Sequence, residues 1–351
     1  NELTKRIIVA AIGIPIAVVL IYAGGVIFTA AVIIISALTL SEFYKLTEKK
    51  GAKPHKFTGI LASVALQSSL YFVFVNSELS SLSFIVLMSL MLLSVIVFSF
   101  ELWLNHKNSI INTSVTISGI LYISFTLGAL IGIRNIHNFN WQQLSGVFPD
   151  FAIKIRSYQL FEGFDDRWSA GILLSIFATA WISDTAAYFT GKKIGKNKLF
   201  PRVSPKKTWE GAIAAFISGI IAFLGLTELL SPGFPLIHII VTGIIISIIG
   251  QIGDLAESQL KRDSNVKDSS SVLPGHGGFL DRFDSIIFIA PVVFLYLLME
   301  RRLKNRSIGV FVMPVAFLIM AYASIAPGIN NRIEPLIPAL QSNWLTSHVL
   351  T

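Results

Sequence analysis

The stretch GAIAAFISGIIAFLGLTELLSPGFPLIHIIVTGIIISIIGQIG, residues 211–253, decides the fold class of this chain. It holds two long apolar runs, Gly211–Leu230 and Leu236–Gly253, and Glu228 is its only charged residue. A helix of about 20 apolar residues is long enough to cross the hydrocarbon core of a bilayer. The stretch therefore predicts two membrane-spanning helices.

Similar runs recur along almost the whole sequence of 351 residues, of which 53% are hydrophobic and 14% are charged. An ordinary soluble domain has about 25% charged residues. The apolar residues are continuous rather than alternating, which excludes a membrane β-barrel. We expect an all-α polytopic integral membrane protein with nine spans plus one extra C-terminal span. The expected spans are Ile7–Ala23, Val26–Tyr44, Phe57–Val75, Ser83–Leu104, Ser109–Ile133, Ala170–Thr190, Gly211–Leu230, Leu236–Gly253, Phe283–Leu298 and the extra Ser307–Ile325.

The charge balance and the lack of cysteine narrow the function classes. With no cysteine, the chain has no disulfide, iron–sulfur cluster or thiolate zinc site. Its 28 basic and 20 acidic residues give a net charge of +8. In a membrane protein this excess first indicates basic cytoplasmic loops, and second a polyanionic ligand.

Basic loops also predict the orientation. The loops Lys45–Lys56 and Gly191–Thr208 hold most of the loop lysines, so we expect both to be cytoplasmic, with the amino terminus inside and Arg134–Ser169 outside. Counting the expected spans from these loops places the basic cluster Arg301–Arg306 outside. This conflicts with the positive-inside rule, by which basic residues stay on the cytoplasmic side.

The first polar stretch with chemical interest is residues 181–191. Asp184 lies inside an apolar run, where a charge is costly and usually functional, and Tyr188 follows four residues later on the same helix face. The alternative is a buried aspartate that pairs only for helix packing.

The second stretch, residues 195–211, is strongly basic. We expect Ser204-Pro205 to open a turn, lysines 206 and 207 to follow it, and Thr208 to cap a helix with Gly211 three residues on. Lysines near a helix N-terminus suit a phosphate. The alternative is a basic loop that only anchors the membrane orientation.

The third stretch begins at the end of the run Leu236–Gly253. If that helix continues, Asp254, Glu257, Ser258 and Lys261 share one face at spacings of three, four and seven residues. These side chains would carry two carboxylates and a cation to the end of a membrane helix.

The next helix is expected to present Asp281, Asp284 and Ser285 on one face. Oxygen ligands in this pattern suit Mg²⁺, and the loop Gly275–Gly278 lets backbone N–H groups approach an anion. His276 within that loop is a weaker candidate for a general base. The alternative is a set of internal salt bridges, since the segment 254–282 has five acidic and four basic residues.

These residues resemble a known family. The pattern Ser258-x-x-Lys261-Arg262-x-x-x-x-Lys267-Asp268-x-x-x-x-x-Pro274-x-His276-Gly277-Gly278-x-x-Asp281-Arg282-x-Asp284 resembles the signature of the phosphatidate cytidylyltransferases, or CDP-diacylglycerol synthases. The stretches Asp184-Thr-x-Ala-Tyr188 and Ser204-Pro-Lys-Lys-Thr-x-Glu210-Gly211 resemble other motifs of that family. The likeness extends over about residues 1–300.

The resemblance implies an enzyme that converts CTP and phosphatidate into CDP-diacylglycerol and pyrophosphate with Mg²⁺, in the cell membrane with its site facing the cytoplasm. CTP, phosphatidate and the bilayer are then the partners; no nucleic acid is expected, and a homodimer is left open. The implied metal ligands are Asp254 and Asp281, followed by Asp268 and Asp284. The catalytic set is Asp254, Lys261, Arg262, Lys267, Asp268, His276, Asp281, Arg282 and Asp284. The substrate-binding set is Asp184, Tyr188, Ser204, Lys206, Lys207, Thr208, Glu210, Ser258, Gly277 and Gly278.

The end of the chain has a separate character. We expect a membrane-embedded cytidylyltransferase domain over residues 1–300, with its catalytic half at about 170–300, and an extra segment over 301–351. Residues 335–349 resemble part of the cytochrome c haem-attachment membrane proteins, with His348 at a haem-ligand position. Since the tryptophan-rich motif and the partner histidine are missing, we expect no haem binding. A fusion or a truncated reading frame would explain the orientation conflict at Arg301–Arg306.

A secondary transporter of an anionic solute is the alternative from another class. It would also need an intramembrane carboxylate such as Asp184, but near the midplane and repeated in both halves of the chain. Here the ionisable residues gather in the second half.

Overall fold

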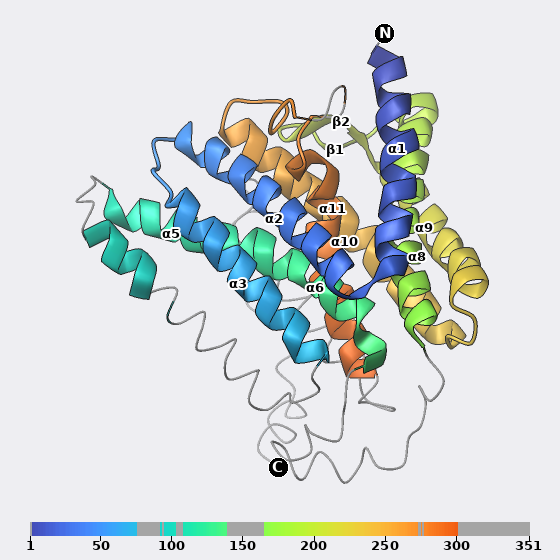
Figure 1. Cartoon of the computed structure of the whole chain (residues 1–351). Coiled ribbons are helices and arrows are strands. Elements are labelled where there is room, and N and C mark those ends of the chain that lie inside the picture. Colours follow the sequence, from blue (N-terminus) through green and yellow to red (C-terminus); the bar gives the residue numbers. More distant parts are fainter. Residues whose placement is uncertain are drawn as a thin grey trace, which may run out of the picture. The chain divides into compact units, whose positions relative to one another are not determined.

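The computed structural model describes residues 2–75, 92, 95–102, 108–138, 165–272, 275 and 277–300, which are mostly helical (Figure 1). These residues belong to one compact unit, residues 1–302. Outside the described part lie the expected span Ser307–Ile325, most of the expected span Ser83–Leu104, the basic cluster Arg301–Arg306 and His348. Within that part, six helices are long and apolar enough to cross a membrane. The chain is therefore a helical, multi-pass membrane protein.

The elements follow the expected runs closely. Gly24 and Gly25 have φ of 60° and 49°, and they separate the first two helices at the predicted break. The helices are α1 (Glu2–Ala23), α2 (Gly25–Glu48), α3 (Lys56–Val75), α5 (Ser109–Gly119), the π-helix η1 (Ile120–Phe125), α6 (Thr126–Arg134), the short 3-10 helix η2 (Ile136–Asn138), α8 (Asp166–Ile194), α9 (Trp209–Leu230), α10 (Leu236–Asp263) and α11 (Leu280–Glu300). The strands are β1 (Lys198–Phe200) and β2 (Ser204–Thr208).

The hairpin of β1 and β2 departs from the all-α expectation. The two strands are antiparallel, with Lys198 opposite Thr208 and Phe200 opposite Ser204. The expected turn at Ser204-Pro205 is wrong, because these residues begin β2 and the turn lies at 201–203. The first residue of an edge strand tolerates proline well, and Pro205 lies near this end. A short polar hairpin therefore replaces the predicted loop.

Helix α9 shows why these helices suit a membrane. One face carries exposed Ile213, Ile217 and Ile221, at 55%, 51% and 65% of their full accessibility. The opposite face buries Ala215 and Gly219. Small residues allow neighbouring helix backbones to approach, and an apolar outer face is stable in lipid. The helix is thus built to pack on one side and to contact acyl chains on the other.

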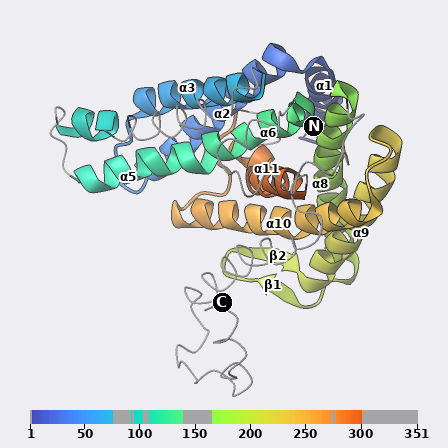
Figure 2. The ribbon, with the colours of Figure 1, turned by 90° about the horizontal axis from the view of Figure 1, so that it is seen from below.

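Helix α11 lies at the centre of the described unit. It contacts α10 on one side and α6 on the other, as Figure 2 shows from below. Its side chains Ile287, Ile289, Ala290 and Val293 are fully buried. Helix α11 therefore packs between helices from both halves of the chain.

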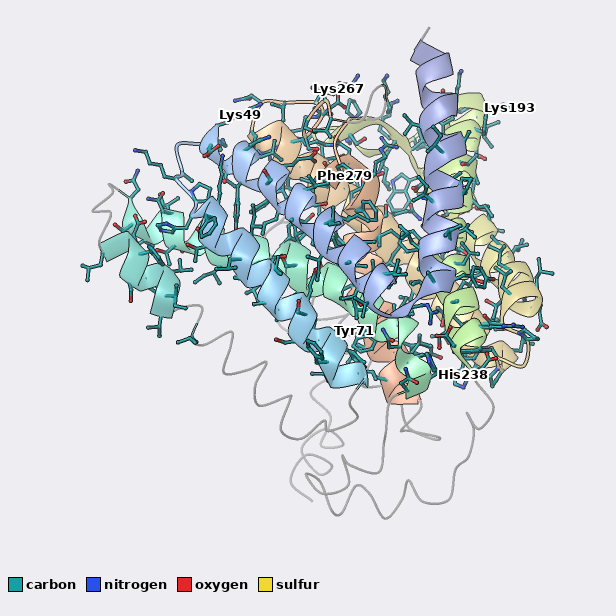
Figure 3. The ribbon with its side chains drawn as sticks, in the orientation of Figure 1. Lys49, Tyr71, Lys193, His238, Lys267 and Phe279 are labelled. Carbon is teal, nitrogen blue, oxygen red and sulfur yellow. The ribbon has the colours of Figure 1, made fainter. Side chains whose placement is uncertain are left out.

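The two ends of the helical bundle differ in their side chains. Lys49, Lys193 and Lys267 lie at one end, and Tyr71 and His238 lie toward the other (Figure 3). We call the first the lysine end and the second the opposite end. The hairpin, the last turns of α10 and the start of α11 lie at the lysine end (Figure 1).

Candidate active site

The last turns of α10 carry the predicted carboxylate face. The helix continues past the expected end at Gly253 to Asp263, which meets the condition for a common face of Asp254, Glu257, Ser258 and Lys261. The Ser258 hydroxyl donates to Asp254 Oδ1 at 3.4 Å. Glu257 is fully buried and forms an ion pair with Lys261 at 2.5 Å.

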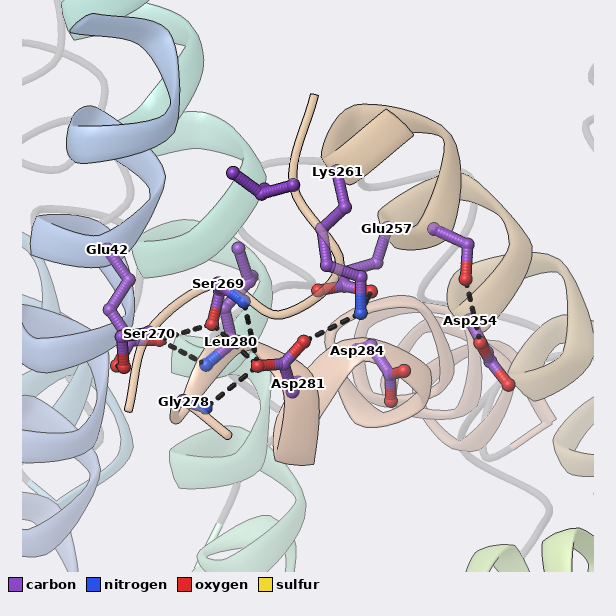
Figure 4. A network of polar contacts seen from close by, with 12 residues as sticks. Glu42, Asp254, Glu257, Lys261, Ser269, Ser270, Gly278, Leu280, Asp281 and Asp284 are labelled. Atoms are coloured by element: carbon purple, nitrogen blue, oxygen red, sulfur yellow. Dashed lines mark hydrogen bonds and ion pairs between the residues drawn. The ribbon is translucent and has the colours of Figure 1, made fainter. Parts of the chain in front are cut away.

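Lys261 joins α10 to α11. Its ammonium group lies 2.6 Å from Asp281 Oδ1 as well as beside Glu257 (Figure 4). Lys261 is buried, at 8% of its full accessibility. A buried ammonium group needs compensating charge, which the two carboxylates supply. The pairing sets the distance between the two helices at this point.

Asp281 receives several hydrogen bonds on its other oxygen. Its Oδ2 accepts from the backbone N–H groups of Gly278 at 2.7 Å and Ser269 at 2.9 Å, and the Ser269 hydroxyl also lies at 2.9 Å. Asp281 precedes the apolar run of α11. Burial opposes its ionisation, but the hydrogen bonds from Lys261, Gly278 and Ser269 prevail and hold the pKa of this carboxyl below its ordinary value. Asp281 is therefore an ionised and tightly held carboxylate.

A second acidic group lies beside the hairpin. Asp254 Oδ2 forms an ion pair with Lys207 of β2 at 2.7 Å. The charges of Asp254 and Asp184 both act on Asp284. Lys207 and Arg282 are the cations whose charges act on Asp184. The charge of Lys261 also acts on Asp284. Three predicted carboxylates, from α8, α10 and α11, thus lie within the electrostatic reach of three predicted cations.

Asp254 and Asp281 have separate partners in this arrangement. Asp254 contacts Lys207 and Ser258, whereas Asp281 contacts Lys261 and the loop that precedes α11 (Figure 4). In Figure 4, Asp284 lies between them. The predicted metal ligands are therefore close neighbours along α10 and α11, but each is held by its own cation.

The hairpin is fixed to the helices by polar contacts. Thr208 caps α9, because its hydroxyl accepts from the Gly211 N–H at 3.2 Å, as predicted. Glu210 accepts from the Asn197 side-chain amide at 2.8 Å and from its backbone N–H. Arg262 donates to the Val203 carbonyl at 3.4 Å. These contacts hold the lysines of β2 beside Asp254.

The other predicted residues lie around this centre. Gly277 has a φ of 81°, which favours glycine. Tyr188 is exposed, with the Lys192 ammonium group 5.8 Å from its ring centroid. Ser204 is half-buried in β2, and His276 lies outside the described residues. Exposed side chains are those of Asp184, Lys206, Arg262, Lys267, Asp268 and Arg282.

Glu42 of α2 is the residue that sequence reasoning missed. It is buried, at 3% of its full accessibility, and it contacts the loop between α10 and α11 (Figure 4). A glutamate inside an apolar run such as Val26–Tyr44 is rare, because a charge there is costly and usually functional. This signal, which identified Asp184 as a candidate, also identifies Glu42.

The carboxylates suit a magnesium ion only together with other ligands. In the part of the chain that the structure describes, no three His, Asp or Glu side chains form a ready metal-binding group. Mg²⁺ in nucleotide enzymes is held by one or two carboxylates, with water and substrate phosphates as the other ligands. Asp254 and its neighbour Asp284 fit that donor set.

The fold and the site define a multi-pass membrane protein with carboxylates and lysines gathered at one end of its helices. The sequence profile of the Cytidylyltransferase family matches residues 4–299. The chain belongs to this family, which confirms the resemblance seen in the sequence.

Three relatives of this chain share one enzyme name. A phosphatidate cytidylyltransferase of Synechocystis sp. is 32% identical over 316 residues, covering 86% of this chain and 99% of that protein. A phosphatidate cytidylyltransferase of Bacillus subtilis is 43% identical over 138 residues, covering 38% of this chain and 49% of that protein. One of Staphylococcus saprophyticus is 43% identical over 126 residues, covering 36% and 48%.

Proposed function

We propose that this chain transfers a cytidylyl group from CTP to phosphatidate, with CDP-diacylglycerol and pyrophosphate as products. The observation that carries the proposal is the match to the Synechocystis relative over 99% of that protein, which is named for this activity. The carboxylates and lysines gathered at the lysine end support it, because a reaction between two phosphates needs charge neutralisation above all.

The reaction needs little acid–base chemistry. The phosphate monoester of phosphatidate has a second pKa near 6, by analogy with other phosphate monoesters, so one of its oxygens is already an anion at neutral pH. That oxygen attacks the α-phosphorus of CTP, the bond to the β-phosphate oxygen breaks, and pyrophosphate leaves with the electron pair. The protein therefore has to position two anions against each other.

Specific side chains suit this task. Lys206 and Arg282 are exposed cations, and Lys207 forms an ion pair with Asp254. These cations would bind the triphosphate and the lipid phosphate. Lys261 is held by two carboxylates, so its role would be to keep α10 and α11 at a fixed distance.

We further propose a magnesium requirement, with Asp254 and Asp284 as ligands that fit best and Asp281 and Asp268 as the other candidates. Bound there, Mg²⁺ would neutralise charge on the phosphates of CTP. Asp281 has Lys261 and the loop as its partners, so its service as a ligand would require Lys261 to move toward Glu257. Asp268 is exposed on that loop.

The membrane arrangement is proposed in the same way. We propose nine spans plus one extra C-terminal span, a cytoplasmic lysine end, and a catalytic domain within residues 1–300. The basic hairpin and the loop after α10 support the orientation, because positive residues stay on the cytoplasmic side. Phosphatidate remains in the leaflet while CTP comes from water, so a site at helix ends suits both substrates.

The test is a transfer assay on the purified chain in detergent micelles. Pyrophosphate should form from CTP only when phosphatidate and Mg²⁺ are both present, and an equal amount of CDP-diacylglycerol should appear. A matched chain that stops after Glu300 should retain the activity. Light scattering on the same sample tests the homodimer that the sequence leaves open. Uptake of an anionic solute by liposomes without phosphatidate, and no pyrophosphate, would favour the transporter instead.

A further inference from the structure

Glu42 binds a segment that is more than 200 residues away in the sequence. Its Oε1 accepts from the Ser270 hydroxyl at 2.6 Å and from the Phe279 N–H at 3.1 Å. Its Oε2 accepts from the Ser269 hydroxyl and the Leu280 N–H, both at 2.9 Å. Figure 4 shows the carboxylate pointing from α2 into this segment. Two hydroxyls and two backbone amides thus converge on one side chain.

These contacts suit an ionised carboxylate without a cation. Two donors for each oxygen match the lone pairs of a carboxylate, and no ion pair of Glu42 occurs among the described residues. Phe279 and Leu280 precede and begin α11, where free N–H groups and the helix dipole favour a negative charge. Glu42 therefore caps α11 from another helix.

Ser269 connects this cap to Asp281. Its hydroxyl lies 2.9 Å from both Glu42 Oε2 and Asp281 Oδ2, and its backbone N–H donates to Asp281. A hydroxyl has one proton, so it can donate fully to only one of the two carboxylates at a time. The position of Asp281 thus depends on the same serine that Glu42 holds.

Gly278 makes the segment fit between the two carboxylates. Its N–H donates to Asp281, and a Cβ added at this position would lie 2.3 Å from Glu42 Oε2. The same Cβ would lie 2.1 Å from the Ser269 hydroxyl, so a larger residue would require both Ser269 and Glu42 to move. Residues 269, 270 and 278–280 are therefore held on one side by Glu42 of α2 and on the other by Asp281 of α11.

We propose that Glu42 is a positioning residue of the transfer reaction: by binding residues 269–270 and the backbone of residues 279–280 at the start of α11, it sets the orientation of Asp281 and, through it, of Lys261. The inference rests on the proposed function. It assigns a role in the second half of the chain to a residue in α2, outside every motif that resembles the family.

The central test is Glu42→Gln. Because each carboxylate oxygen accepts one backbone N–H, the amide NH₂ of glutamine must face one of these donors wherever it points, so one hydrogen bond is lost. We expect kcat to fall by about tenfold, with the KM for CTP changed by less than about threefold, because orientation and not binding is altered. Glu48→Gln is the matched control on the same helix, since Glu48 pairs with exposed Lys56, and it should keep the wild-type kcat.

A matched serine pair separates positioning from general stability. Ser269→Ala and Ser270→Ala each remove one hydroxyl that binds Glu42, but only Ser269 also contacts Asp281. The proposal expects a clearly larger loss of kcat in Ser269→Ala, at similar thermal stability. Equal losses in the two variants, or wild-type kcat in Glu42→Gln, would overturn it. If Glu42→Gln fails to fold, the serine pair decides alone.

Amide hydrogen exchange gives a readout that needs no activity. In Glu42→Gln the amides of Phe279 and Leu280 should exchange faster, while those in the middle of α11 should stay protected. Unchanged exchange would overturn the anchoring itself. Absence of transfer by the wild-type chain would instead disprove the proposed function, so the two failures are distinguishable.

Discussion

Buried charge is handled differently at the two ends of the helical bundle. At the opposite end, Arg134 is fully buried and binds Asp166 in a bidentate ion pair, at 2.5 and 2.9 Å, and the Ile21 carbonyl at 2.6 Å. At the lysine end, Glu42 is buried among neutral donors and Asp254 pairs with Lys207, while Asp184 and Asp284 form no ion pair within the described residues. The charges at the opposite end are thus fully paired with each other, whereas two carboxylates at the lysine end have no ion-pair partner in the described part of the chain.

The comparison teaches which end serves stability and which serves function. A bidentate pair with every donor used has nothing left to offer to a substrate. An acidic group with exposed cations beside it can still bind a polyphosphate together with a metal ion. We therefore expect substitutions of Arg134 and Asp166 at the opposite end to reduce stability, and those of the acidic and basic side chains at the lysine end to reduce turnover.

The largest effect is expected for Asp281→Asn. If Asp281 takes part in binding the metal or in orienting Lys261, turnover should fall by about 100-fold, because a charge next to the reacting phosphates is lost. The asparagine carbonyl can still accept from Gly278, so the protein should remain folded. Transfer assays and thermal unfolding in detergent test this together. Near-normal turnover would reject the role of Asp281.

Substitutions at the opposite end should lower the free energy of unfolding. Asp166→Ala leaves the buried Arg134 without its charged partner, and a loss of about 3 kcal/mol in the free energy of unfolding is expected. Arg134→Met should cost less, because the remaining Asp166 is exposed and can be solvated. Thermal unfolding measures both, and the activity of the folded fraction should stay unchanged. A loss of kcat without a loss of stability would contradict the division between the two ends.

A smaller effect is expected for Lys206→Ala. Lys206 is exposed on β2 beside Lys207, so its loss should raise the KM for CTP by about fivefold and the KM for phosphatidate less. Lys193→Ala, which removes an exposed lysine at the end of α8, is the control and should change neither value. A larger change for the lipid would assign Lys206 to the lipid phosphate.

The smallest effect is expected for Thr208→Ala. The substitution removes the hydroxyl that caps α9 at Gly211, and loss of such a cap costs about 1 kcal/mol. Thr208→Ser keeps the hydroxyl and should restore the wild-type unfolding temperature. If both variants unfold like the wild type, the cap does not stabilise α9.

Local patterns in the sequence predicted much of the fold and part of the site. The apolar runs located α2, α3, α8, α9 and α10 within a few residues at most ends, because helix length follows from the thickness of the membrane. The spacing of Asp254, Glu257 and Lys261 predicted their common face, because helical periodicity is local. The cap at Thr208 was predicted for the same reason, whereas the hairpin was not, because Pro205 suggested a turn.

Helix packing decided the rest. Lys261 could pair with Glu257 on its own helix or with Asp281 on the next, and the structure brings it to both. Glu42 meets Ser269 across 227 residues of sequence. From residue types and spacings alone, the sequence determined the family of the chain, the positions of its membrane helices and which side chains gather at one end. Which donors and acceptors come within 3 Å of each other was decided only by the tertiary structure, because a hydrogen bond depends on distance and angle between helices that no local pattern specifies.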